Sequence, residues 1–151
     1  METPVLNTRW LATLRGTISE PTPIGGNMLV FNVDEAELEG PKISAVVVPP
    51  SGDWLRVMAN GNWKLDVRLM LETTDGAHIL CTYTGTLKAD TGLSERIANG
   101  ESVPGTDMYF RSTPYFETSD SRYEWLNDIV CVGTMRQFGA EEAVYDIFEV
   151  L

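Results

Sequence analysis

Acid–base catalysis is the chemistry for which this sequence carries the most suitable side chains. The candidate catalytic residues are Asp53, Arg68, Tyr83, Arg111, Glu117 and Tyr123. A carboxyl group removed from water has a raised pKa and can act as a general base near neutral pH. The planar fork of an arginine can hold an anionic or carbonyl oxygen, and a tyrosine hydroxyl can donate a hydrogen bond to it. Together these residue types predict proton transfer on an oxygenated substrate.

Substrate-binding residues are expected beside these groups. The candidates are Trp54, Asp66, Trp125 and Asn127. The tryptophans would form walls against a planar molecule, and Asn127 would donate to an oxyanion. Tyr123 and Asn127 are four residues apart, so on a helix they would share one face above the pocket.

The candidates also have ordinary structural interpretations, which the sequence leaves open. Asp53 follows the strand breaker Pro49-Pro50-Ser51-Gly52 and would cap a turn there. Arg68 would form an exposed ion pair with Asp66, worth about 0–1 kcal/mol. Trp54 would simply plug one end of the fold.

Other kinds of active site are disfavoured. The single histidine, His78, follows a predicted turn, which argues against a Ser/His/Asp triad. The pair Gly25-Gly26 is not followed by a helix and does not predict a phosphate cradle. Cys81 and Cys131 lie in apolar runs without a CxxC pattern, so we expect two buried reduced thiols. No metal site and no cofactor are predicted.

Charge and composition limit the classes of molecule that this protein is expected to bind. The chain has 151 residues, 43% of them hydrophobic, and a formal net charge of −11. Phosphate backbones and anionic membrane surfaces repel such a protein, so neither nucleic acid nor membrane is an expected partner. The sequence shows no leader and no run of about 20 apolar residues, so we expect a soluble, cytoplasmic protein.

Short apolar runs separated by turn residues favour an all-β fold, either a sandwich or a barrel, and we expect the chain to form one domain over residues 1–151. No long amphipathic helix separates the runs, which argues against βαβ units. Short helical segments are predicted at Leu93–Ala98 and Ser121–Leu126. The nine predicted strands span Asn7–Ser19, Met28–Leu38, Lys42–Val48, Trp54–Met58, Lys64–Thr73, Ala77–Lys88, Met108–Glu117, Asp128–Arg136 and Ala143–Leu151.

The pair Asp75-Gly76, between two alternating runs, favours a two-residue hairpin turn. That turn would place Arg68 opposite Tyr83, with Asp66 on the same face and a row of leucines on the other. In one interpretation the mixed face is solvated and the leucines fill the core. In the other, the mixed face lines a barrel lumen as a polar cluster, and a second subunit or another element covers the leucines.

Several short motifs, in order along the chain, resemble a family of small proteins called domain of unknown function thirty-two thirty-seven. They are Gly40-Pro41-Lys42-Ile43, Gly52-Asp53-Trp54, Leu65-Asp66-Val67-Arg68, Thr74-Asp75-Gly76, Tyr109–Thr118 and Tyr123–Asn127. The resemblance implies a closed, calycin-like antiparallel barrel that is often a homodimer or a higher oligomer. It also implies a protein without a cofactor, sometimes encoded near genes for small-molecule, secondary metabolism. It implies no particular activity.

The function expected from these observations is a cofactor-independent lyase, isomerase or cyclase. Its substrate would be a small, largely apolar, oxygenated metabolite bound in the lumen of the barrel. The alternative is a non-catalytic barrel that carries or senses such a molecule. A third possibility is a structural subunit whose lumen is filled by its own side chains.

Overall fold

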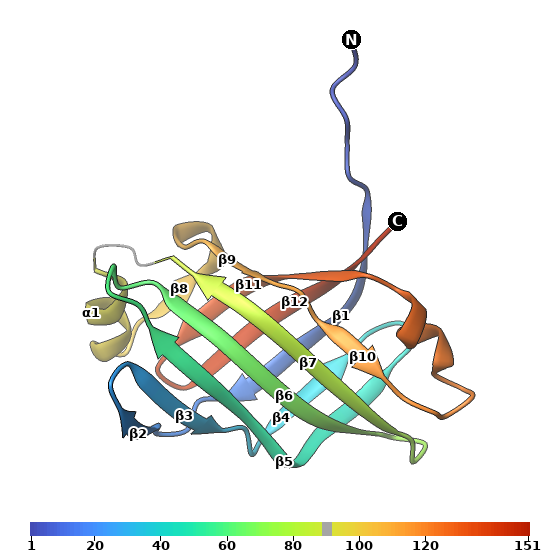
Figure 1. Cartoon of the computed structure of the whole chain (residues 1–151), viewed down its shortest axis with the longest axis horizontal. Coiled ribbons are helices and arrows are strands. Elements are labelled where there is room, and N and C mark those ends of the chain that lie inside the picture. Colours follow the sequence, from blue (N-terminus) through green and yellow to red (C-terminus); the bar gives the residue numbers. More distant parts are fainter. Residues whose placement is uncertain (89–91) are drawn as a thin grey trace.

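Antiparallel strands closed into a barrel make up most of the computed structural model, which describes residues 1–88 and 92–151 (Figure 1). Eight strands form the ring, in the order β1, β4, β5, β6, β7, β9, β11 and β12, and β12 pairs with β1 again. The predicted all-β barrel is therefore confirmed. The ring strands are β1 (Thr8–Thr17), β4 (Ala36–Glu39), β5 (Ser44–Val57), β6 (Trp63–Thr73), β7 (His78–Leu87), β9 (Phe110–Ser112), β11 (Cys131–Gly139) and β12 (Glu142–Val150).

Shorter elements cover the two ends of the barrel. They are β2 (Thr22–Gly25), β3 (Met28–Asn32), α1 (Leu93–Ala98), β8 (Ser102–Pro104), η1 (Gly105–Asp107), β10 (Tyr115–Glu117) and η2 (Glu124–Asp128). In Figure 1 the elements α1, β2 and β8 gather at one end, whereas β10 lies toward the other. No helix within residues 1–88 and 92–151 combines the length and the apolar character needed to cross a membrane.

Several predicted boundaries differ from the structure. The predicted strand Met28–Leu38 is two strands, β3 and β4, and Met108–Glu117 is interrupted between β9 and β10 at Pro114, which has no amide to donate. The two strands predicted on either side of the breaker at residues 49–52 form the single strand β5. The predicted helix Ser121–Leu126 is instead the 3-10 helix η2, which has no side-chain cap at its start.

The connection between β6 and β7 is a three-residue loop, residues 74–76. The Thr73 N–H donates to the Ala77 carbonyl (2.9 Å), and the Gly76 N–H donates to the Thr73 carbonyl (3.0 Å). Gly76 has a φ of 89°, a left-handed conformation that costs glycine little. The predicted two-residue turn is therefore wrong. The extra loop residue displaces the register by one, so that Arg68 pairs with Thr82 instead of Tyr83.

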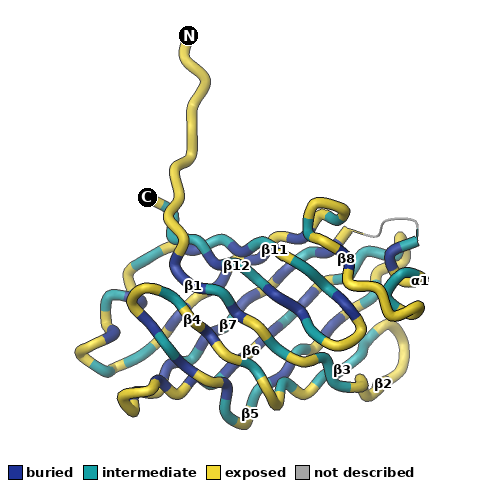
Figure 2. The backbone as a smooth tube through the Cα atoms, turned by 180° about the vertical axis from the view of Figure 1, so that it is seen from behind, coloured by how far each residue is buried: buried dark blue, intermediate teal, exposed yellow. Residues whose placement is uncertain are grey.

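This displacement changes which side chains the barrel encloses, because neighbouring residues of a strand face opposite sides. Tyr83 is buried on the inner face with Val67 and Leu69, whereas Asp66 and Arg68 point outward. Figure 2 shows the resulting alternation of buried and exposed positions along the strands. The expectation that Asp66 and Arg68 face the lumen is wrong, and the leucine side of β6 lines it.

Both cysteines are buried free thiols, as predicted. Burial raises the pKa of Cys81 to about 12 and that of Cys131 to about 11. Because the thiolate is the reactive form, both residues act as small apolar groups of the core.

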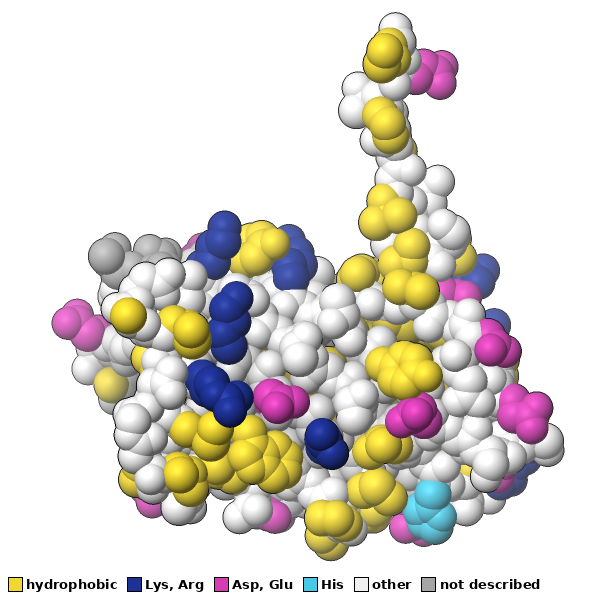
Figure 3. Space-filling view, in the orientation of Figure 1, with side chains coloured by type: hydrophobic (Ala, Val, Ile, Leu, Met, Phe, Trp, Pro, Cys, Tyr) yellow, Lys and Arg dark blue, Asp and Glu magenta, His cyan; other side chains and the backbone are white. Residues whose placement is uncertain are grey.

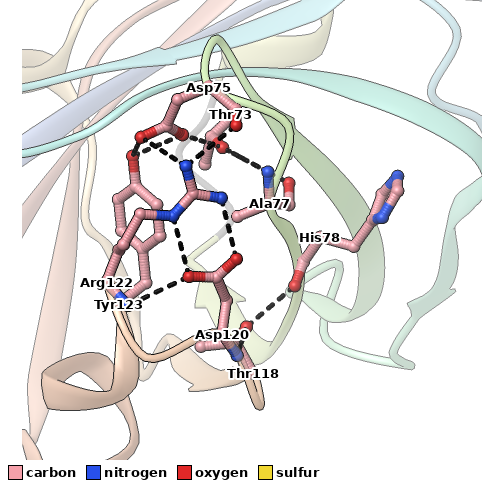
Figure 4. A network of polar contacts seen from close by, with 8 residues as sticks. All are labelled: Thr73, Asp75, Ala77, His78, Thr118, Asp120, Arg122 and Tyr123. Carbon is pink, nitrogen blue, oxygen red and sulfur yellow. Dashed lines mark hydrogen bonds and ion pairs between the residues drawn. The ribbon is translucent and has the colours of Figure 1, made fainter.

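A polar network ties the tip of the β6–β7 hairpin to the segment before η2 (Figure 4). The Tyr123 hydroxyl donates to both carboxylate oxygens of Asp75 (2.8 and 2.9 Å). Arg122 donates to the Asp75 carbonyl (2.9 Å) and to both carboxylate oxygens of Asp120. Next to this network, Leu126 and Phe116 are buried in the core. This end of the barrel is therefore closed by packed side chains.

Gly76→Ala should lower the free energy of unfolding by about 1–2 kcal/mol, because an L-residue with a Cβ is strained at this positive φ. A Cβ built at Gly76 meets no atom within 4 Å, so a steric clash would not explain the loss. Urea unfolding measures the effect. Gly76→Asn is the matched control and should lose less, because asparagine tolerates the left-handed region. Equal stability of Gly76→Ala and the unsubstituted protein would contradict the assigned loop conformation.

Candidate functional site

A cavity of about 780 Å³ occupies the half of the barrel next to α1. This volume suits a small organic molecule. Its walls are mainly apolar and come from strands that are distant in sequence. They include Leu14, Phe31, Leu55, Trp63, Leu65, Val67, Leu69, Leu87, Phe110, Met135 and Phe138. The rim is formed by residues 17–21, by Ile97 and Ala98 of α1, and by the turn between β11 and β12.

Asp53 is the carboxylate that β5 brings into this cavity. It pairs with Phe31 of β3 on one side and with Val67 of β6 on the other, and all three residues line the cavity. Its Oδ1 accepts a hydrogen bond from the Asp66 backbone N–H (3.2 Å). The side chain is therefore fixed at a wall that is otherwise made of hydrocarbon groups.

Burial raises the pKa of Asp53 from 3.8 to about 7, because the apolar surroundings penalise the charged form. The hydrogen bond from Asp66 N–H opposes this change, and the nearby negative charge of the Asp66 carboxylate adds to it. At neutral pH the carboxyl group is thus present in both its protonated and its ionised form. A group in this condition can accept a proton and also return one.

Two tyrosines share the cavity with Asp53. The rings of Tyr83 and Tyr145 lie with their centroids 6.4 Å apart, and Phe110 packs against Tyr145 at 5.3 Å. Burial raises the pKa of both hydroxyls, and the charge of Asp53 raises them further. Neither hydroxyl bonds to another side chain or backbone group in the described part of the chain, so both can donate to a bound molecule.

The cavity offers few groups that could bind a metal. Among its described lining residues, the carboxylates are Asp53 inside and Glu20 at the exposed rim. A protein zinc site takes three or four ligands, usually histidine or cysteine. The donor set therefore suits a neutral, weakly polar organic molecule better than a metal ion.

Comparisons with known proteins agree with this fold. The family model described as "Protein of unknown function (DUF3237)" matches residues 6–150. The chain belongs to the DUF3237 family. A UPF0311 protein of Rhodopseudomonas palustris is 29% identical over 99% of each sequence. Its crystal structure matches with a TM-score of 0.90 and 30% identity, covering 99% of this chain and 100% of that one.

More distant structures share the barrel. A β-barrel-like protein of Acinetobacter baumannii matches with a TM-score of 0.74 at 25% identity, over 99% of each chain. A protein of Penicillium herquei that is described as an enzyme matches with a TM-score of 0.68 at 17% identity, over 100% of this chain and 99% of that one. At that identity the likeness concerns the fold alone.

In this DUF3237 barrel, two of the predicted site residues line the cavity, namely Asp53 and Tyr83. Trp54, Arg68 and Glu117 are exposed on the outer surface. Their strand positions alternate with buried neighbours, so the barrel wall separates them from the cavity. The structure therefore does not bring Arg68, which was predicted to hold a substrate oxygen, into the cavity with Asp53, which was predicted to act as a general base.

The other predicted residues lie in two further places. Asp66 and Arg111 line a separate groove on the outer face of the barrel. Tyr123, Trp125 and Asn127 lie at the closed end. There Asn127 accepts the Thr118 N–H (2.9 Å) and donates to the Thr118 carbonyl (2.8 Å). The hydrogen bonds of Asn127 to Thr118 and of Tyr123 to Asp75 link segments at this end, and Trp125 packs against the core.

Tyr145 is a cavity residue with a polar hydroxyl that the sequence did not single out. Ala143, Tyr145 and Ile147 alternate in β12, and Ala143 and Tyr145 both line the cavity. This alternation was a usable signal for an inward-facing tyrosine. Its position beside Tyr83, 62 residues earlier by the numbering (145 − 83), follows only from closure of the barrel.

The raised pKa of Asp53 makes the stability of the protein depend on pH. The native carboxyl holds its proton up to about pH 7, whereas the unfolded one releases it near pH 4, so stability falls as the pH rises through this window. Asp53→Asn removes this dependence. Its stability relative to the unsubstituted protein should increase between pH 4 and pH 8, by at most about 4 kcal/mol for a shift of this size.

Urea unfolding of both proteins at several pH values measures this difference. Asp128→Asn, at an exposed position of η2, is the control for loss of one negative charge. A difference between Asp53→Asn and the unsubstituted protein that stays constant from pH 4 to pH 8 would show that Asp53 is not buried as an acid.

Proposed function

We propose that the barrel cavity binds a small, largely apolar, oxygenated molecule and that Asp53 moves a proton on it. The reaction would be that of a lyase, isomerase or cyclase and would need no cofactor. The observation that supports this proposal is the Asp53 carboxyl group inside a cavity of hydrocarbon walls, where burial raises its pKa to about 7 and two phenols share the cavity with it. Perturbed acids in clefts are typical of catalytic sites.

The proposed step begins with the ionised form of Asp53. The carboxylate takes a proton from a carbon next to a carbonyl group and becomes neutral. The electron pair of the broken C–H bond moves onto the carbonyl oxygen, which accepts hydrogen bonds from Tyr83 and Tyr145. Asp53 then returns the proton to a second atom, which completes an isomerisation, elimination or ring closure without any change of oxidation state.

The apolar walls support this chemistry in two ways. Removal of water strengthens the hydrogen bonds that the phenols make to a developing negative charge. The same walls contribute to binding through burial of apolar surface, at roughly 25 cal/mol per Å². A ligand with one or two oxygen atoms on a hydrocarbon frame would bury apolar surface against these walls and accept hydrogen bonds from the phenols. A sugar or a charged metabolite would leave its own polar groups without partners in the cavity.

Exchange of carbon-bound hydrogen tests the step without knowledge of the natural substrate. The probe is 2-tetralone, a compact ketone, incubated with the protein in D₂O and followed by NMR. The unsubstituted protein should accelerate deuterium incorporation, with a rate that rises as the pH passes through about 7. Asp53→Asn should lose about 10²-fold or more of that acceleration, and Tyr83→Phe about tenfold.

Calorimetric titration of the same ketone separates catalysis from binding. The proposal predicts that Asp53→Asn still binds 2-tetralone, while Asp128→Asn retains both binding and exchange. A carrier or sensor would bind the ketone equally well with and without Asp53 and would leave exchange at the rate of the buffer. Binding without accelerated exchange would contradict catalysis and favour the non-catalytic binding barrel.

Native mass spectrometry of the purified protein would reveal a co-purified ligand and the number of subunits.

A further inference from the structure

A row of positive charges crosses the outside of the barrel, away from the cavity. Arg56 of β5 pairs with Lys64 of β6, Lys64 pairs with Thr86 of β7, and Thr86 pairs with Arg111 of β9. The three cationic residues are exposed on the outer surface. Because neighbouring strands are about 4.8 Å apart, the row spans roughly 14 Å. Like charges directly opposite each other destabilise a sheet, so this arrangement has an energetic cost.

The cations of this row have no carboxylate partner among the described residues. Lys64 Nζ donates to Thr86 Oγ1 (2.9 Å), and Arg111 donates to the Phe110 carbonyl (2.6 Å). The Arg111 guanidinium also lies over the ring of Tyr109, at 4.9 Å, with Lys88 over the same ring at 4.4 Å. By contrast, ion pairs engage Arg9, Arg15, Arg96, Arg122 and Arg136 elsewhere on the surface.

Charge segregation of this kind is unexpected in a chain with a net charge of −11. Figure 3 shows dark blue side chains gathered in a band on the left half of the face in view, with few magenta ones between them. In the described lining of the groove that Arg56, Lys64 and Arg111 share, Asp66 is the acidic residue, and it is partly buried. The local field at this face is therefore positive although the protein as a whole is negative.

The groove has the shape and the donors for a small anion. It measures about 760 Å³ and presents Arg56, Lys64 and Arg111 together with the hydroxyl-bearing residues Thr84, Thr86 and Thr113. Guanidinium and ammonium groups are the usual partners of phosphate and carboxylate oxygens, and hydroxyls supplement them. An extended polyanion such as a nucleic acid would also cross the acidic remainder of the surface. A compact ligand stays within about one Debye length, roughly 8 Å, of the cations.

We propose that this groove binds a compact polyanion, a small molecule that carries two or three phosphate or carboxylate groups. The site is separate from the barrel cavity and does not depend on the chemistry of Asp53. Two anions distinguish the possible ligand groups: inorganic tripolyphosphate and citrate. Either anion would bind at the row of cations. The anion with the lower dissociation constant identifies whether the groove prefers phosphate or carboxylate groups.

Isothermal titration calorimetry of the full chain with each anion tests the site. One equivalent of tripolyphosphate or citrate should bind, more weakly as salt is added. Arg56→Gln, Lys64→Gln and Arg111→Gln should each weaken binding at least about fivefold. Lys42→Gln removes an exposed cation that lies over Trp125, in contact with the opposite end of the barrel, and should leave binding unchanged. Asp53→Asn should also bind normally.

Two results would overturn the proposal. One is the absence of measurable binding of both anions up to about 1 mM. The other is equal weakening by Lys42→Gln and by the three groove variants, which would indicate attraction to positive charge in general. Circular dichroism of each variant establishes that it is folded. All four side chains are exposed, so their replacement is expected to change the stability of the fold little, and a loss of binding would reflect the loss of the charge.

Discussion

The register between β6 and β7 decides which side chains the barrel encloses, and the loop at Gly76 fixes that register. Side chains alternate across a strand, so a shift of one residue would exchange the leucine face of β6 with the face that bears Asp66 and Arg68. The shifted form would bury an arginine and an aspartate in an apolar interior, at a cost of several kcal/mol. Turn geometry and the hydrophobic effect therefore select the same pairing. Both the cavity and the outer groove depend on it.

The strands place apolar side chains inside the barrel and polar ones outside, and Asp53 is the exception to this arrangement. The irregularity in β5 around residues 49–51 inserts two extra residues relative to β6, and an even number leaves the alternation unchanged. Asp53 consequently faces inward with Val47 and Leu55. A carboxyl group in such a place destabilises the fold whenever it is ionised, which is the usual cost of a group whose pKa suits proton transfer near neutrality.

The wall formed by β5 and β6 carries opposite chemistry on its two sides. Asp53 faces the cavity and Asp66 faces the outer groove, while the Asp66 amide donates to the Asp53 carboxyl through the wall. Inside, Asp53 lies among hydrocarbon walls and two phenols. Outside, cations in register form a positive patch on an acidic protein. Net charge describes the average field of the protein, whereas a small ligand responds to the charges within a few ångströms.

The sequence by itself determined the class of fold and the family, and it named Asp53 and Tyr83 among the candidates, both of which line the cavity. Alternating apolar runs and turn residues are local signals, and they are sufficient to predict an all-β fold and the helix at residues 93–98, whereas the closed barrel was implied by the family resemblance. The relative faces of the candidates on β6 and β7, namely Asp66, Arg68 and Tyr83, were decided by one residue in a hairpin loop, which the pair Asp75-Gly76 does not specify. The meeting of Tyr83 with Tyr145, and the alignment of Arg56, Lys64 and Arg111 in one row, were decided by the tertiary structure alone. Closure of the barrel joins strands that are far apart in the chain, and no local pattern records that pairing.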